Sequence, residues 1–197
     1  MKTGPYDPQI SGKTKYASVA ALTRQEYDPP LDEAKVSACL DKPGIDRLHD
    51  VAAVFCSDLL RTKQTADFLV RQKIVNNKAS VTASSLLREI RFDVATVCSE
   101  EDYAQRGSDA VRQGFIDGFI SDSLLESRNE IKARCDQLLA HMRQETNDTL
   151  FISHTFFLKI FLIYLEQPSL FEQPSIISEF IDPRKRIMKF CEQIFLP

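Results

Sequence analysis

The sequence predicts a three-layer α/β domain with a largely parallel sheet, and three observations lead to this fold class. The chain has 197 residues, which is enough for one domain with a substantial core and too few to expect two. Apolar, strand-like runs alternate with helical segments along the chain. The segments between the runs are long enough for parallel crossovers, which need a dozen or more residues. We expect residues 1–15 to form a flexible lead-in and residues 16–197 to form the domain.

Several short apolar runs have the composition of buried strands. Residues 51–56 read VAAVFC, with β-branched and aromatic side chains and no polar interruption, as a central parallel strand requires. The other expected strands either alternate apolar with polar residues or carry small apolar residues. They are residues 16–23, 78–83 and 149–153, with a last strand expected at either 187–191 or 193–196.

The segments between these runs carry helix signals. One helix begins at Asp32 and is ended by Pro43-Gly44, and a second follows over residues 61–72. Residues 100–145 are mostly helical, and residues 155–165 form a further apolar helix that packs on the sheet. The clearest helical stripe lies within the 100–145 stretch and consists of Ile131, Cys135, Leu138, Leu139 and Met142.

Composition excludes several classes of partner. A formal net charge of -3 and the lack of any Lys/Arg run argue against a nucleic-acid-binding protein. No apolar run approaches the ~20 residues of a membrane span. The five cysteines are scattered without a CxxC pair, which predicts no metal site and a reducing, cytoplasmic setting. The absence of an N-terminal apolar signal segment favours the same location, and we expect no cofactor.

Three residues that could carry chemistry each lie just past a predicted strand. They are Arg61, Glu89 and His154, and the carboxyl edge of a parallel sheet is where ligands bind. An arginine offers a planar fork to two phosphate oxygens, and a histidine at a helix start can hydrogen-bond a phosphoryl oxygen. Glu89 has an apolar frame that could raise its pKa and make it a general acid. Taken singly, each could equally be a structural residue.

Together these residues match a known pattern in order and local sequence. The stretch Cys56 to Ala66 resembles the SxLxRxxQTA segment of the histidine phosphatase superfamily, the phosphoglycerate-mutase-like group. Leu87 to Ile90 is similar to the family's LxE segment, which carries its proton donor, and Phe151 to His154 is similar to its VSH strand. The resemblance spans roughly residues 16–190. Two shorter matches are Pro30-Leu31-Asp32, which resembles a PLT helix start, and Glu126-Ser127, which resembles the Glu-Ser before the last long helix.

The resemblance implies a three-layer α/β/α sandwich and phosphoryl transfer through a phosphohistidine. In the family, the nucleophilic histidine belongs to an RHG triplet at the end of the first strand, and the triplet's arginine helps to hold the phosphate. On our alignment Arg24 stands for that arginine, and Gln25 takes the place of the histidine. The implied pocket therefore consists of Arg24, Arg61, Glu89 and His154.

The glutamine at position 25 predicts a pocket that binds a phosphoryl group with weak or absent phosphatase activity. A glutamine amide is not nucleophilic, so the covalent route is closed. Gln25 could still donate a hydrogen bond to a phosphate oxygen. The two remaining histidines, His49 and His141, fall away from the expected site and are expected at the surface. The expected partner is a phosphorylated small molecule or a phosphoprotein.

Two alternatives remain open at this point. The protein could be an active phosphomonoesterase or mutase-family phosphatase whose nucleophile lies in a missing or altered N-terminal segment. It could also be a non-catalytic protein-interaction domain with a vestigial pocket.

The insertion at residues 92–125, where family members vary their substrate lid, is acidic and argues against a polyanionic substrate. Its acidic side chains are Glu100, Glu101, Asp102, Asp117 and Asp122.

Overall fold

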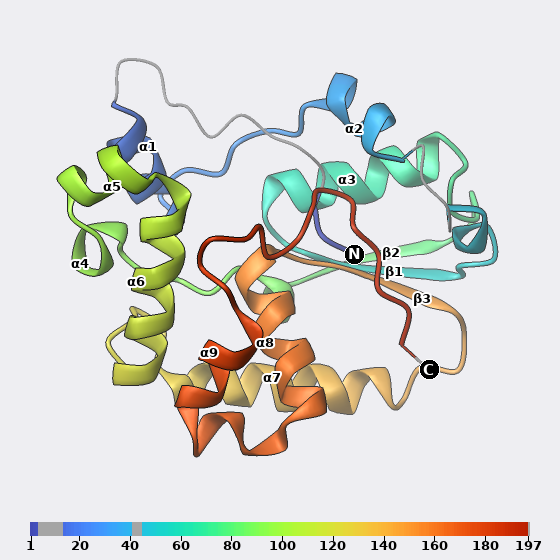
Figure 1. Ribbon diagram of the computed structural model, residues 1–197. Helices are drawn as coiled ribbons and strands as arrows, with labels where there is room; N and C mark the ends of the chain where they lie inside the picture. The colour runs from blue at the N-terminus through green and yellow to red at the C-terminus, as the bar shows by residue number, and fades with distance from the viewer. Residues whose placement is uncertain (4–13, 41–44, 197) are drawn as a thin grey trace.

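A parallel sheet of three strands forms the centre of the protein (Figure 1). The computed structural model describes residues 1–3, 14–40 and 45–196. The strands have the spatial order β2-β1-β3 and run in register, so their carboxyl ends meet at one edge. Their bounds are Ala53–Ser57 for β1, Ser80–Ser84 for β2 and Thr149–Ile152 for β3. The three corresponding strand predictions are confirmed.

The central strand contributes side chains to the cores on both faces of the sheet. In β1, Val54 and Cys56 are fully buried in one apolar cluster, which also contains Ala66 and Leu69 of the following helix. Phe55 points the other way and packs against the second and larger cluster. This alternation follows from the two-residue repeat of a strand. Because both faces are covered, the strand needs the continuous apolar run that the sequence shows.

Helices cover the two faces of the sheet and extend beyond its carboxyl edge (Figure 1). On one face lie α2 (Glu33–Leu40) and α3 (Leu60–Arg71), and on the other lie α7 (Arg128–Met142) and α8 (Thr155–Glu166). A separate group stands past the strand ends and consists of α1 (Lys15–Thr23), α4 (Val94–Val97), α5 (Glu100–Arg106) and α6 (Ser108–Ser121). The short elements are η1 (Ile45–Leu48), η2 (Ser85–Leu87), η3 (Pro168–Phe171), η4 (Pro174–Ile176) and α9 (Ile177–Phe180). The mixed α/β fold class is confirmed, whereas the predicted stop of α2 at Pro43-Gly44 lies outside the described residues.

The prediction of a first strand at residues 16–23 is wrong. These residues form α1, whose first turn is capped by the Thr14 side chain, which accepts a hydrogen bond from Ala17 N. Ala17, Ala20 and Ala21 favour a helix, and a capped N-terminus removes one unsatisfied donor. The residue pattern of a short apolar run does not distinguish a buried strand from a buried helix. Here the cap formed by Thr14 favours the helix.

The first residues of the chain, and not residues 16–23, lie beside the end of the third strand. Lys2 forms a parallel bridge with Ser153, and Thr3 N donates to Ser153 O at 2.8 Å. Residues 1–3 are all buried, so they do not behave as the flexible lead-in that we expected. Residues 4–13 lie outside the described part of the chain.

The predicted last strand is also wrong, because residues 187–196 contain no strand. Cys191 has a φ of 53°, a left-handed conformation that ends any extended run. Glu192 O instead accepts a single backbone hydrogen bond from Lys2 N, at 3.1 Å. The C-terminal segment therefore crosses beside the first residues without joining the sheet. In the part of the chain that the structure describes, no helix combines the length and apolar character needed to cross a membrane.

A close approach between α4 and α6 gives a test of this packing. A Cβ atom added at Gly114 would lie 2.1 Å from the Val97 carbonyl oxygen, which is backbone and cannot move away cheaply. At Gly118 the nearest atom is a Leu124 methyl at 2.5 Å, which belongs to a flexible side chain. We predict that Gly114→Ala lowers the free energy of unfolding by about 1–3 kcal/mol and that Gly118→Ala lowers it less. Urea unfolding measures both, and equal losses would contradict the backbone contact.

Candidate functional site

Arg61 is held at the start of α3, directly after the central strand. The residue is 4% exposed. Nη1 donates to Asp28 Oδ1 at 2.8 Å, and Nη2 lies 3.0 Å from Nδ1 of His154. Asp28 also accepts a hydrogen bond from the Leu60 backbone N–H, so one carboxylate fixes both the helix start and the arginine. The guanidinium is thereby preorganised between two elements that are far apart in sequence.

His154 follows β3 and precedes the first residue of α8, as the sequence predicted. The side chain is 2% exposed. Burial, with the charge of Arg61 as the second cause, holds the pKa of His154 well below its ordinary value. The ring is therefore neutral near pH 7.

The contact with Arg61 also selects the tautomer of that neutral ring. A guanidinium can only donate, so His154 Nδ1 accepts the hydrogen bond and Nε2 carries the proton. The Nε2 atom is buried and has no hydrogen-bond partner among the described residues. His154 therefore presents a buried N–H donor that lacks an acceptor, which is a costly arrangement unless a ligand satisfies it.

Glu89 lies close to both residues, and its carboxylate caps the helix that follows His154. Oε1 accepts the Phe157 N–H at 2.9 Å, and Oε2 accepts the Phe156 N–H at 3.2 Å. The anion site at the N-terminus of α8 is therefore filled by Glu89 itself. Desolvation raises the pKa of Glu89, while the backbone N–H bonds from Phe157, Phe156 and Ile90 oppose that rise.

Arg134 on α7 fixes the loop that presents Glu89. Its Nη1 donates to the Arg88 carbonyl oxygen at 3.0 Å, and its Nε lies 2.7 Å from Glu126 Oε1. Glu126 also accepts the Arg91 backbone N–H at 3.2 Å. This pair brackets the Glu89 loop on both sides, and it explains why an acidic residue precedes Ser127, the N-cap of α7.

Arg24 and Gln25 do not enter the same site. Arg24 follows α1 and forms ion pairs with Glu26 at 2.9 Å and with Asp93 at 3.3 Å. Gln25 has a φ of 59°, and its Nε2 donates to the Glu89 carbonyl oxygen at 2.8 Å. The sequence analysis placed both residues at the end of a strand over residues 16–23. In the structure these residues form the helix α1 instead. The structure thus brings Arg61, Glu89 and His154 together. Of the five predicted residues, only Arg61 and Glu89 line the cleft described next.

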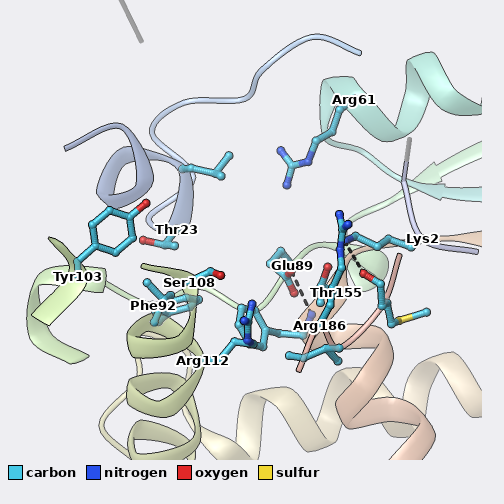
Figure 2. A pocket seen from close by; sticks show the side chains of 15 residues that line it. Lys2, Thr23, Arg61, Glu89, Phe92, Tyr103, Ser108, Arg112, Thr155 and Arg186 are labelled. Carbon is cyan, nitrogen blue, oxygen red and sulfur yellow. Dashed lines mark hydrogen bonds between the residues drawn. The ribbon is translucent and has the colours of Figure 1, made fainter. Parts of the chain in front are cut away.

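A cleft of about 500 Å³ opens beside these residues (Figure 2). Its lining includes Glu89 and Arg61, which enters from α3, and Arg112, which enters from α6. Lys2 and Arg186 complete the charged lining. Among the described residues, four cationic side chains and a single carboxylate therefore face the cleft, although the whole chain is acidic.

Lys2, Arg112 and Arg186 were not predicted from the sequence. Lys2 lies in a segment without periodicity, and only its bridge to Ser153 places it at the site. Burial and, second, the charge of Arg186 lower the pKa of Lys2 to about 8. Arg112 and Arg186 fall in segments that carried no recognisable motif. No sequence signal that we used could have found them.

The sequence of this chain matches that of a known protein family. Residues 12–176 match the sequence profile of the histidine phosphatase superfamily (branch 1). The chain belongs to this superfamily. A comparison with curated proteins gave no match.

Several solved structures are similar to this chain. A mycobacterial hydrolase is 16% identical with a TM-score of 0.53, and the match covers 88% of this chain and 80% of the hydrolase. A phosphoglycerate mutase from Bacillus anthracis is 16% identical with a TM-score of 0.48, covering 85% and 78%. A phosphoserine phosphatase from Entamoeba histolytica, solved with 3-phosphoglyceric acid, is 19% identical with a TM-score of 0.47, covering 87% and 81%. At such identities the likeness concerns the fold.

One of the three histidines lies at the candidate site. Of the three histidines in the sequence, His49 is exposed near the amino end of β1. His141 lies on α7, where its ring centroid is 4.3 Å from that of Phe55 and its Nε2 is 3.5 Å from Glu145. Neither of these histidines lines the cleft. His154 is not among the lining residues either, but it lies 3.0 Å from Arg61, which lines the cleft, and it is thus the one imidazole that contacts the arginine of the site.

The buried neutral state of His154 predicts a specific acid sensitivity. In the unfolded chain this histidine takes up a proton below about pH 6.5, whereas in the folded protein it resists protonation. Its contribution to stability is therefore present above about pH 6.5 and is lost as the pH falls toward the folded pKa. Between about pH 7.5 and about pH 5.5, the parent should lose ~1 kcal/mol more unfolding free energy than His154→Asn. Urea unfolding at both pH values tests this, and parallel losses in the two proteins would contradict it.

Proposed function

We propose that the cleft binds the phosphoryl group of a phosphate ester through Arg61 and His154 and turns the ester over weakly or not at all. The observation that carries this proposal is the Arg61–His154 pair, which is buried and 3.0 Å apart. The pair offers a fixed cation beside an N–H donor that has no acceptor among the described residues. A phosphoryl oxygen supplies both the negative charge and the missing acceptor.

The weak turnover follows from the state of the only imidazole. A phosphohistidine forms when a ring nitrogen attacks phosphorus with a free lone pair. In His154 the Nδ1 lone pair faces Arg61, and Nε2 carries the proton. The ring in this state donates a hydrogen bond and is not a nucleophile. Stabilisation of charge by Arg61 and His154 can still accelerate attack by water modestly.

Glu89 is the candidate acid in that residual reaction. It lines the cleft, and its raised pKa favours a carboxyl group that can protonate a leaving alkoxide. Its two oxygens also accept backbone N–H groups of α8, which a proton transfer would have to weaken. We therefore assign Glu89 first to the positioning of His154 and second to acid catalysis.

Phosphate binding is tested by thermal unfolding. Millimolar phosphate or vanadate should raise the melting temperature of the parent by a few degrees, because a ligand that binds the folded state stabilises it by mass action. Arg61→Gln should abolish the rise. Should Arg61→Gln fail to fold, His154→Asn serves instead, since it keeps an acceptor for Arg61 and removes the Nε2 donor. Arg143→Gln, on an exposed position after α7, should respond like the parent.

Two outcomes would contradict the proposal. An unchanged melting temperature of the parent would leave a protein-interaction domain with a vestigial pocket. Rapid hydrolysis of an aryl phosphate that depends on Arg61 would contradict the weak turnover and support an active phosphatase.

A further inference from the structure

The first residues of the chain bridge the two elements that carry Arg61 and His154. Residues 1–3 lie between α3 and the end of β3 (Figure 1), and each of them is 7% exposed or less. This segment belongs to neither element. A residue of the segment that binds both elements therefore couples the position of Arg61 to that of His154, and Thr3 makes both contacts.

Backbone hydrogen bonds fasten the segment to the residue that precedes His154. Thr3 N donates to the Ser153 carbonyl oxygen at 2.8 Å, and Ser153 N donates to the Met1 carbonyl oxygen at 2.9 Å. Both backbone groups of Ser153 are thus bound to the segment, as in a parallel bridge in which Lys2 is the partner of Ser153. The backbone at the start of His154 therefore depends on residues 1–3.

The side chain of Thr3 reaches the first turn of α3. Its Oγ1 donates to the Arg61 carbonyl oxygen at 3.3 Å and lies 3.2 Å from Oγ1 of Thr65. Thr65 Oγ1 donates to the same carbonyl oxygen at 2.6 Å. Thr3 is 1% exposed and Thr65 is fully buried, so bulk water does not replace these bonds. Losing a buried hydrogen bond of this kind leaves a polar group without compensation.

The sheet itself does not extend far enough to fix the distance between the two side chains. The last pair in the register of β1 and β3 is Cys56 with Ile152. Residues 57–60 separate this pair from Arg61, and Ser153 separates it from His154. The contact between the two side chains spans only 3.0 Å, and a hydrogen bond weakens steeply when its geometry changes. Thr3 supplies a tie between the two backbones beyond the last register pair.

We infer that Thr3 is a positioning residue of the phosphoryl site, and that its hydroxyl holds Arg61 at hydrogen-bonding distance from His154. The inference rests on the proposed function, which assigns a phosphoryl oxygen to this pair. Thr3 itself does not line the cleft, so it acts through the pair and not by contact with the ligand. Small displacements of groups that hold a ligand cause large losses, and this is why one buried hydroxyl matters for binding.

Three variants separate the hydroxyl from the remainder of the side chain. Thr3→Val keeps the shape and removes the hydroxyl, whereas Thr3→Ser keeps the hydroxyl. The matched control is Tyr16→Phe on α1, which removes a hydroxyl that donates to the Cys98 carbonyl oxygen at 2.7 Å and does not line the cleft. Calorimetric titration with inorganic phosphate should show about fivefold weaker binding for Thr3→Val than for the parent. Thr3→Ser and Tyr16→Phe should stay within about twofold of the parent.

Nitrogen-15 NMR of the imidazole gives a readout that a loss of stability alone does not change. In the folded parent near pH 7, we expect the His154 proton on Nε2, because Arg61 donates to Nδ1. In Thr3→Val the weakened contact should select the tautomer less strictly, so the Nδ1 resonance should move toward the average of the two neutral tautomers. Thr3→Ser and Tyr16→Phe should keep the parent spectrum. Should Thr3→Val fail to fold, Thr3→Cys replaces it, since a thiol is a weak donor and should move the resonance in the same direction.

Two results would overturn the inference. One is an Nδ1 resonance of His154 that the loss of the Thr3 hydroxyl does not move, whatever happens to phosphate affinity. The other is an equal change in Thr3→Ser and Thr3→Val, which would show that the hydroxyl is not the cause.

Failure of the proposed function gives a different pattern. The NMR measurement needs no ligand, so a moved Nδ1 resonance in Thr3→Val would still support the coupling of Thr3 to the Arg61–His154 pair if phosphate does not bind the parent. In that case the proposed function would fall, while the positioning of the pair by Thr3 would stand.

Discussion

The contact between Arg61 and His154 is the interaction on which the site depends. Each residue lies where a parallel strand passes into a helix, Arg61 after β1 and His154 after β3. Because β1 and β3 pair in register, the two helix starts are neighbours, and a 3.0 Å contact joins them. The register of the sheet thus determines the geometry of the site. Burial and, second, the charge of Arg61 keep the imidazole neutral. The contact with Arg61 also fixes which ring nitrogen carries the proton.

The remaining contacts at the site serve to hold this pair in place. Asp28 binds Arg61 from one side, and Glu89 fixes the first turn of α8 next to His154. Arg134 then holds the loop of Glu89 through the Arg88 carbonyl oxygen. Such buried ion pairs contribute little net stability, but removing one partner typically costs about 3–5 kcal/mol. The network therefore holds the residues around the cationic cleft in fixed positions and adds little net stability.

The sequence predicted the parts of this site that local patterns encode. The strands at residues 51–56 and in the segment Phe151 to His154 were predicted correctly because buried parallel strands are continuously apolar. The strand at residues 16–23 was predicted wrongly because alanine-rich runs suit a helix as well as a strand. Because of that error, we assigned Arg24 and Gln25 to the end of a strand that the structure does not contain. Lys2 and Arg186 reach the cleft through tertiary contacts alone, which no local period or spacing encodes.

The central claim is that His154 donates from Nε2 to a phosphoryl oxygen, and nitrogen-15 NMR of the imidazole tests it most directly. In the free protein near pH 7, two-bond proton–nitrogen correlations should show a neutral ring with its proton on Nε2. Saturating phosphate should move the Nε2–H resonances of His154 and leave those of His49 and His141 in place. A proton on Nδ1, or Nε2–H resonances that phosphate does not move, would contradict the account.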